Sequence, residues 1–109
     1  MIKGHKIERK IEINEFLEII RHYDKQNVDI TNHTTFRLSD ELRKVFKDDF
    51  IKEFILHTVP ILVGLQFNKC YAVFYRFQKE PLRFILDIQP NKVGVVTFYA
   101  IDEQQIPRI

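Results

Sequence analysis

The sequence predicts an α+β fold in which about three short helices pack on one face of a four-stranded, or five-stranded, antiparallel meander sheet. Three observations lead to this expectation. Four apolar stretches follow one another between residues 61 and 101, separated by short polar breaks. Breaks of this length join neighbouring antiparallel strands. Amphipathic stretches with helical spacing precede the strands, and an apolar sheet face needs such helices to cover it.

The length and composition indicate a single domain. A chain of 109 residues can form one hydrophobic core, and its hydrophobic fraction of 45% is that of a packed protein. We divide the domain into an N-terminal extended piece with a helix (residues 1–27), a helical cover (residues 28–60) and the antiparallel sheet (residues 61–101).

The N-terminal part is expected to contain one helix. Isoleucines alternate with polar residues over residues 6–13, which fits either a short strand or an extended lead-in. Asn14 is a suitable N-cap, and the apolar residues that follow share one helical face. The pattern predicts a helix over residues 15–25.

The middle of the chain is expected to supply two further helices. Residues 28–31 read as a short extended piece. A helix is expected to begin either in the polar stretch of residues 31–38 or at Ser39, which can cap it, and its apolar stripe ends at Phe46. A second stripe begins at Phe50 and ends near His57, and Pro60 stops it.

The strands have two different faces if their register is simple. One face is apolar and takes the helices. The opposite face gathers polar side chains: Arg76, Arg83, Asp87, Gln89, Thr97 and Tyr99. A slip of one residue in any strand would reverse the contribution of that strand.

The residue types argue against several kinds of site. The four histidines show no metal-ligand spacing, and three glycines cannot build a phosphate loop. No nucleophile motif is present, and Cys70 fits a small core residue. We therefore expect no metal and no cofactor.

Charge and targeting signals limit the partners. The net charge of +2 is too small to indicate nucleic-acid binding by itself, so a basic site would need local segregation of charge. The first residues contain no apolar signal core, and one cysteine suggests a reducing compartment. The expected location is the cytoplasm, with no membrane partner because no apolar run is long enough to span a bilayer.

His33 and Arg37 form the first candidate site. They are four residues apart and would share a face of a helix. A histidine for proton transfer beside an arginine that holds a phosphate suits phosphodiester chemistry. A hydrophilic helix start with a surface histidine explains the same residues.

The polar face of the sheet is the second candidate. Arg76, Arg83, Thr97 and Tyr99 could bind a phosphodiester, and arginine and tyrosine can stabilise a developing negative charge without a metal. Tyr99 could also stack on a base. The alternative is an ordinary solvent face on which Arg83 and Asp87 pair along the strand.

The order of these features resembles the small ribonuclease toxins of the BrnT and RelE type, within the barnase–EndoU–colicin–RelE group. The resemblance covers about residues 28–101. It rests on Thr31, His33 and Arg37 before the sheet, and on the final strand from Val95 to Tyr99.

The resemblance implies a metal-independent endoribonuclease acting by general acid–base catalysis. His33, Arg37 and Tyr99 would be catalytic, and Arg76, Arg83 and Thr97 would contact RNA. The implied partners are RNA and a small antitoxin protein. A non-catalytic module of the same fold, which binds protein or nucleic acid or forms a homodimer, remains the alternative.

Overall fold

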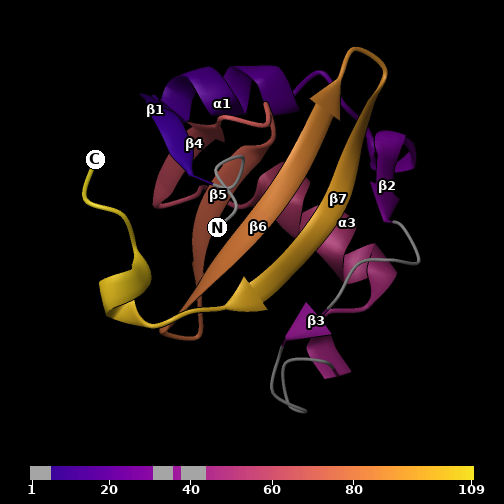
Figure 1. The fold of residues 1–109 in the computed structure, drawn as a ribbon. Coiled ribbons are helices and arrows are strands. Elements are labelled where there is room, and N and C mark those ends of the chain that lie inside the picture. The colour runs from indigo at the N-terminus through magenta and orange to yellow at the C-terminus, as the bar shows by residue number, and fades with distance from the viewer. Residues whose placement is uncertain (1–5, 31–35, 38–43) are drawn as a thin grey trace.

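The computed structural model describes residues 6–30, 36–37 and 44–109, with the backbone alone for residues 36–37. The described elements begin with β1 (Ile7–Ile11), α1 (Ile13–Ile20), η2 (Lys25–Asn27), β2 (Val28–Ile30), β3 (Phe36–Arg37) and α3 (Asp48–His57). They continue with β4 (Leu62–Gln66), β5 (Tyr71–Phe77), β6 (Glu80–Gln89), β7 (Lys92–Ala100) and η3 (Glu103–Gln105). The fold is α+β, with a mostly antiparallel sheet, as the sequence predicted (Figure 1).

The sheet is wider than the predicted meander. Strands β4 to β7 form the expected antiparallel core, but the described strands lie in the order β1-β4-β5-β6-β7-β2, and β3 also pairs with β7. Strands β2 and β3 run parallel to β7, along successive parts of its edge. The expectation of four or five strands was too low because short segments of two or three residues carry almost no periodicity.

The helices differ from the prediction in extent. The first helix, α1, starts after Glu12 instead of at the predicted Asn14 cap, and it ends at Ile20 rather than near residue 25. The Tyr23 hydroxyl donates a hydrogen bond to the carbonyl of Gln89, which holds the chain after α1 against the β6–β7 hairpin. The final helix, α3, matches its prediction, whereas the expected helix after Ser39 falls mostly outside the described residues.

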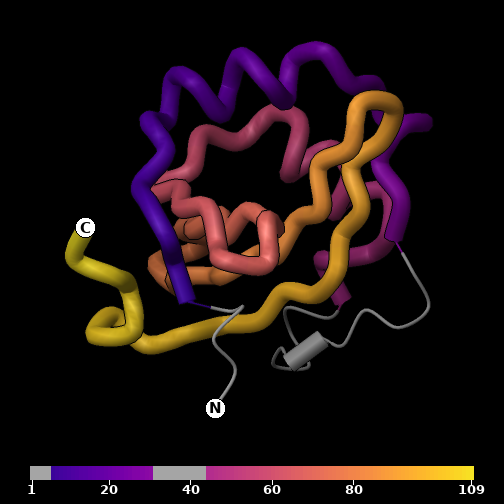
Figure 2. The backbone as a smooth tube through the Cα atoms, turned by 45° about the horizontal axis from the view of Figure 1, so that its top comes forward, coloured from indigo at the N-terminus to yellow at the C-terminus, as the bar shows by residue number. Residues whose placement is uncertain are grey.

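Helices α1 and α3 cover one face of the sheet. In Figure 1, α3 lies behind β6 and β7, and Figure 2 shows α1 passing over the end of the sheet. Phe46, just before α3, contacts the rings of Phe54, Phe77, Phe84 and Phe98 at centroid distances of 5.1–6.5 Å. This aromatic cluster forms the centre of the main core.

A β-bulge corrects the predicted faces of the last strand. Ile85 pairs with Thr97 and Leu86 pairs with Val95, so Val96 is an extra residue opposite no partner. Val93 and Val95 therefore point into the main core together with Phe98. In a simple register without a bulge, strict alternation with Phe98 would instead place Gly94 and Val96 on the helix side.

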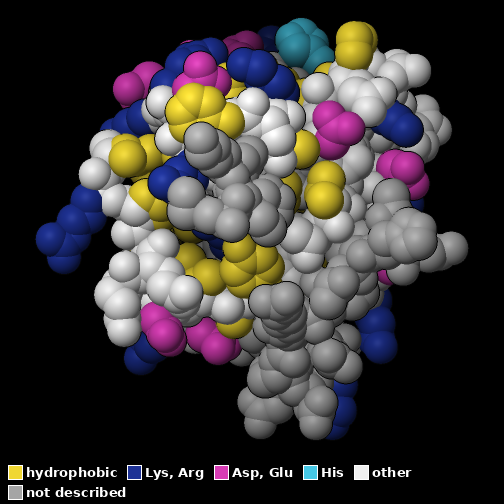
Figure 3. All heavy atoms as spheres, viewed as in Figure 1, with side chains coloured by type: hydrophobic (Ala, Val, Ile, Leu, Met, Phe, Trp, Pro, Cys, Tyr) yellow, Lys and Arg dark blue, Asp and Glu magenta, His cyan; other side chains and the backbone are white. Residues whose placement is uncertain are grey.

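The opposite face carries a smaller apolar cluster of its own. Its buried members are Leu62, Ala72, Phe74, Ile85 and Ile101. Ile7 of β1 lies over Gly64, where an added Cβ would come within 2.7 Å of the Ile7 side chain. We call this side the open face, because neither α1 nor α3 covers it. Figure 3 views the molecule from this side and shows apolar side chains next to charged ones.

Candidate functional site

A row of residues crosses the open face from strand to strand. Arg37 of β3 pairs with Tyr99 of β7, Tyr99 pairs with Arg83 of β6, and Arg83 pairs with Phe74 of β5. We call these four residues the cross-strand row. Adjacent members of such a row have Cβ atoms about 5 Å apart in antiparallel pairs. Of Arg37 only the backbone is described.

The bulge at Val96 makes this row possible. Without the extra residue, the alternation that places Val93 and Val95 in the core would also turn Tyr99 inward. With it, Thr97 and Tyr99 lie on the open face opposite Ile85 and Arg83. The bulge thus reverses the faces on which the side chains before Val96 lie, while the polar residues after it stay on the open face.

Arg83 is held at the centre of the row by stacking. Its guanidinium carbon lies 5.4 Å from the centre of the Phe74 ring, which is a cation–π contact. Phe74 is buried, while Arg83 and Tyr99 are half-buried. A guanidinium fixed in this way is oriented in advance for a planar or anionic ligand.

Thr97 lies in the next row, opposite Ile85, and Arg76 lies two residues along β5 from Phe74. The structure therefore brings Arg83, Thr97 and Tyr99 together and puts Arg76 on the same face. Arg76 already has a partner, because its two terminal nitrogens both donate to the carboxylate of Glu103. Asp87, which the alternative paired with Arg83, accepts a hydrogen bond of 2.9 Å from Gln89.

Two further predictions concern His33 and Cys70. Arg37 lies in strand β3, so the prediction that it shares a helical face with His33 is wrong. His33 itself lies outside the described residues, so its place relative to the row stays a prediction. Cys70 packs against the cluster on the open face. Partial burial raises the pKa of its thiol, and the negative charge of Asp87 raises it further. A thiol protonated in this way is a poor nucleophile, which fits the structural role predicted for it.

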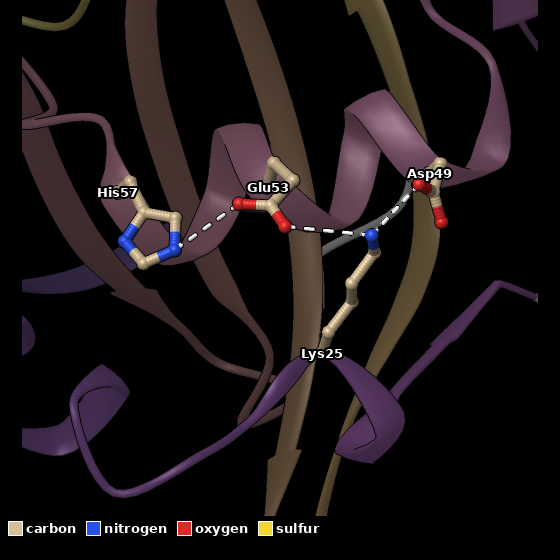
Figure 4. Close-up of polar contacts among 4 residues, drawn as sticks. All are labelled: Lys25, Asp49, Glu53 and His57. Carbon is tan, nitrogen blue, oxygen red and sulfur yellow. Dashed lines mark hydrogen bonds and ion pairs between the residues drawn. The ribbon is translucent and has the colours of Figure 1, made fainter.

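A second polar cluster lies on the far side of the main core. The Lys25 amine is 2.7 Å from Asp49 and 3.4 Å from Glu53, and Glu53 is 3.2 Å from His57 (Figure 4). Hydrogen bonding to Asp49 raises the pKa of Lys25. We call this chain of contacts the η2–α3 ladder. A groove of about 490 Å³ lies beside it, lined by Asp24, Lys25, Gln26, Asp49 and Lys52.

The groove mixes cations and carboxylates, and Lys25 pairs with Asp49 at its wall. Within the described residues, no three histidine, cysteine or acidic side chains are grouped to hold a metal. The helices of the same residues are too short or too polar to cross a bilayer. The ladder joins η2 to α3 through exposed ion pairs. We take the cross-strand row as the stronger candidate site.

Comparisons of the chain with family models, curated proteins and solved structures found no match. The functional argument therefore depends on the geometry of the row. Sequence reasoning found Arg83, Thr97 and Tyr99 by alternation. It missed the roles of Phe74 and Glu103: Phe74 was treated as an ordinary apolar residue, and Glu103 belongs to a tail that has no periodicity.

Proposed function

We propose that this domain acts on RNA at the cross-strand row, as a metal-independent endoribonuclease resembling the toxin of a toxin–antitoxin pair. The observation that supports this proposal is the row itself. Three residues selected from sequence, Arg37, Tyr99 and Arg83, have neighbouring backbone positions on three strands.

The chemistry assigned to the row is that of phosphodiester binding. Arg83 would donate to a phosphate, since guanidinium groups match phosphate oxygens in bidentate pairs. Tyr99, next to it, would stack on a base or donate to the developing charge. Arg37 would hold the same phosphate from the β3 side, and Arg76 and Thr97 would extend the contact along the strand.

Cleavage needs a group that moves a proton, and this role is assigned to His33. The reaction would be attack of a ribose 2′-hydroxyl on the adjacent phosphate, with a 2′,3′-cyclic phosphate and a free 5′-hydroxyl as the two new ends. His33 would take the proton from the 2′-hydroxyl or give one to the leaving oxygen. The cognate partner would be a small antitoxin that covers the row.

The test is cleavage of a labelled single-stranded RNA by the purified chain, with EDTA present, between pH 5 and pH 9. We expect cyclic-phosphate ends, loss of cleavage in His33→Ala, and retained binding of a non-cleavable 2′-O-methyl RNA by that variant. Arg83→Lys should weaken this binding about 10-fold or more, because a bidentate contact is lost. Arg21→Lys, at an exposed position outside the row, is the matched control, because it makes the same exchange of one cation for another.

RNA that stays intact at every pH with the unsubstituted chain would contradict the ribonuclease proposal. Binding without cleavage would instead favour the second candidate, a non-catalytic RNA-binding module. One observation favours this second candidate. The described side chains of the row are a guanidinium, a phenol and an aromatic ring, which can hold RNA but do not accept a proton at neutral pH.

The edge of β1 offers a weaker surface for a protein partner. Its outer side pairs with no other strand of the described residues, but Glu8, Arg9 and Lys10 are all exposed on it. A register shift between Ile7 and Arg9 also bends this strand. Charges and bulges on an edge strand oppose the addition of another strand, so we do not assign dimerisation to this edge.

A further inference from the structure

The C-terminal tail, residues 101–109, folds back onto the open face. Figures 1 and 2 both show it running from the end of β7 toward the side of the sheet where β1 lies. The backbone amide of Ile101 donates to the carbonyl of Pro81 at 3.0 Å. Ile101 is buried in the cluster on this face, and Ile106 packs against the same cluster. These two isoleucines anchor the tail at both ends of η3.

Between the two anchors, the tail presents a carboxylate to Arg76. Nη1 of Arg76 donates to Oε1 of Glu103, and Nη2 donates to Oε2 at 3.3 Å. The hydrogen bond with Arg76 lowers the pKa of Glu103, so this carboxylate is charged at neutral pH. Two parallel contacts from one guanidinium are also how arginine binds a phosphate.

Arg76 is close enough to the cross-strand row to contact the same ligand. Phe74 pairs with Arg83 and Arg76 pairs with Pro81, which makes Arg76 and Arg83 diagonal neighbours on one face. Diagonal positions in an antiparallel pair are about 7–8 Å apart, and both side chains are long. Consecutive phosphates of a single strand are separated by a similar distance, so the two arginines suit adjacent phosphates.

We propose that the tail is an acidic strap that partly closes the RNA-binding face: Glu103 occupies Arg76 in the free protein, and an RNA phosphate takes its place in the complex. This inference rests on the proposed function. It adds that the C-terminal tail of the same chain regulates RNA binding at that site.

The ion pair between Arg76 and Glu103 is exposed to solvent, which allows an RNA phosphate to replace the Glu103 carboxylate. The side chains of Arg76 and Glu103 are 40% and 62% exposed. Ion pairs this exposed are weak and screened by salt. The apolar anchors at Ile101 and Ile106 stay in place, so only the Glu103 side chain has to swing away.

The test measures binding of a non-cleavable 2′-O-methyl RNA to the full chain and to Glu103→Gln over a series of salt concentrations. We expect Glu103→Gln to bind a few-fold more tightly, roughly two- to fivefold, as befits an exposed pair. At salt concentrations at which the Glu103 carboxylate still competes for Arg76 in the wild type, the variant should also show a steeper salt dependence. The slope of log K against log salt should differ by up to about 0.7, because one more phosphate contact with the single strand forms.

The matched control is Glu8→Gln. Glu8 pairs with Lys69 at 3.4 Å, at the opposite end of β5, so this variant makes the same change of net charge and also releases one cation. It should change affinity much less than Glu103→Gln. In addition, Arg76→Gln should cost more affinity in the Glu103→Gln background than in the wild type. Thermal unfolding of each variant checks that the fold is retained.

The outcomes separate the two proposals. An equal gain in RNA affinity in Glu8→Gln and Glu103→Gln would mean that the effect comes from net charge alone. This outcome would overturn the strap proposal. Binding by the wild type with no change in Glu103→Gln would overturn the strap and leave the RNA proposal in place. No binding by any of the variants would overturn both.

Discussion

The two faces of this sheet are built in different ways. The helix-covered face packs phenylalanine rings against each other, with Phe84 and Phe98 stacked at 4.5 Å. The open face has only a small apolar cluster, with arginine, tyrosine and threonine next to it. Apolar contacts stabilise a fold without directing chemistry, whereas oriented polar groups at a surface bind ligands. The comparison therefore assigns the main stabilising contacts to one face, and the proposed site lies on the other.

The largest expected effect tests how much the helix-covered face contributes to stability. Phe84→Ala removes a fully buried ring that contacts Phe46, Phe54 and Phe98. It should lower the free energy of unfolding by about 3–5 kcal/mol, as is typical of Phe-to-Ala changes in cores. Urea unfolding measures it. Phe74→Ala makes the same change on the open face and should cost less, near the lower end of that range at about 3 kcal/mol, because its apolar cluster is smaller. Equal losses would remove the distinction between the faces.

Close packing on the open face is tested by Gly64→Ala. The new Cβ would lie 2.7 Å from Cγ2 of Ile7, nearer than van der Waals contact allows. Overpacking of this kind costs about 1–3 kcal/mol. The double variant Gly64→Ala with Ile7→Ala should lose less stability than the sum of the two single changes, because the clash is removed. A double variant less stable than the sum of both single changes would argue against this contact as the cause.

A polar group inside the main core gives a smaller effect. The Tyr75 hydroxyl is buried and has no hydrogen-bond partner among the described residues. Tyr75→Phe should therefore be neutral or raise the free energy of unfolding by about 1 kcal/mol, because an unsatisfied buried hydroxyl is removed. A loss of more than this amount in urea unfolding would show that the hydroxyl has a stabilising contact.

Tyr75 also predicts a response to alkaline pH. Burial raises the pKa of its phenol, so the proton leaves the unfolded chain more readily than the folded one. The contribution of the protonated phenol to the free energy of unfolding is fully present below about pH 10, the ordinary tyrosine pKa. It declines as the pH rises beyond that value. The stability of Tyr75→Phe should decline less over the same range. Parallel curves for the two proteins, measured by urea unfolding from pH 8 to pH 11, would contradict this linkage.

The smallest effect belongs to the η2–α3 ladder. Lys25→Met removes a solvent-exposed cation from Asp49 and Glu53. We expect a shift of the thermal midpoint near the limit of measurement, visible mainly at low salt, because exposed ion pairs contribute little. A large loss at high salt would mean that the ladder, like the main core, holds the fold together.

Much of the architecture was accessible from sequence because its signals are local. Four apolar runs with polar breaks predicted β4 to β7, and the stripe from Phe50 predicted α3. Strands β2 and β3 were not predicted as parallel partners of β7, because a few residues cannot reveal which distant strand they join. The shorter α1 reflects the same limit, since caps compete with tertiary contacts that the local pattern does not contain.

The candidate site was predictable to a similar degree. Alternation placed Arg83, Thr97 and Tyr99 on one face, and the structure does the same. The contact of Glu103 with Arg76 was not foreseen, because it joins residues 27 positions apart through a tail without a repeating pattern. The stacking of Arg83 on Phe74 likewise depends on the register between β5 and β6.

The sequence by itself determined the class of fold, the antiparallel centre of the sheet and the polar residues of its second face, because side-chain alternation and helical spacing are properties of neighbouring residues. Only the tertiary structure decided the bulge at Val96, the parallel strands on the edge of β7 and the contact of Glu103 with Arg76. Each of these depends on which distant segment pairs with which, and that choice is made by packing of the whole chain.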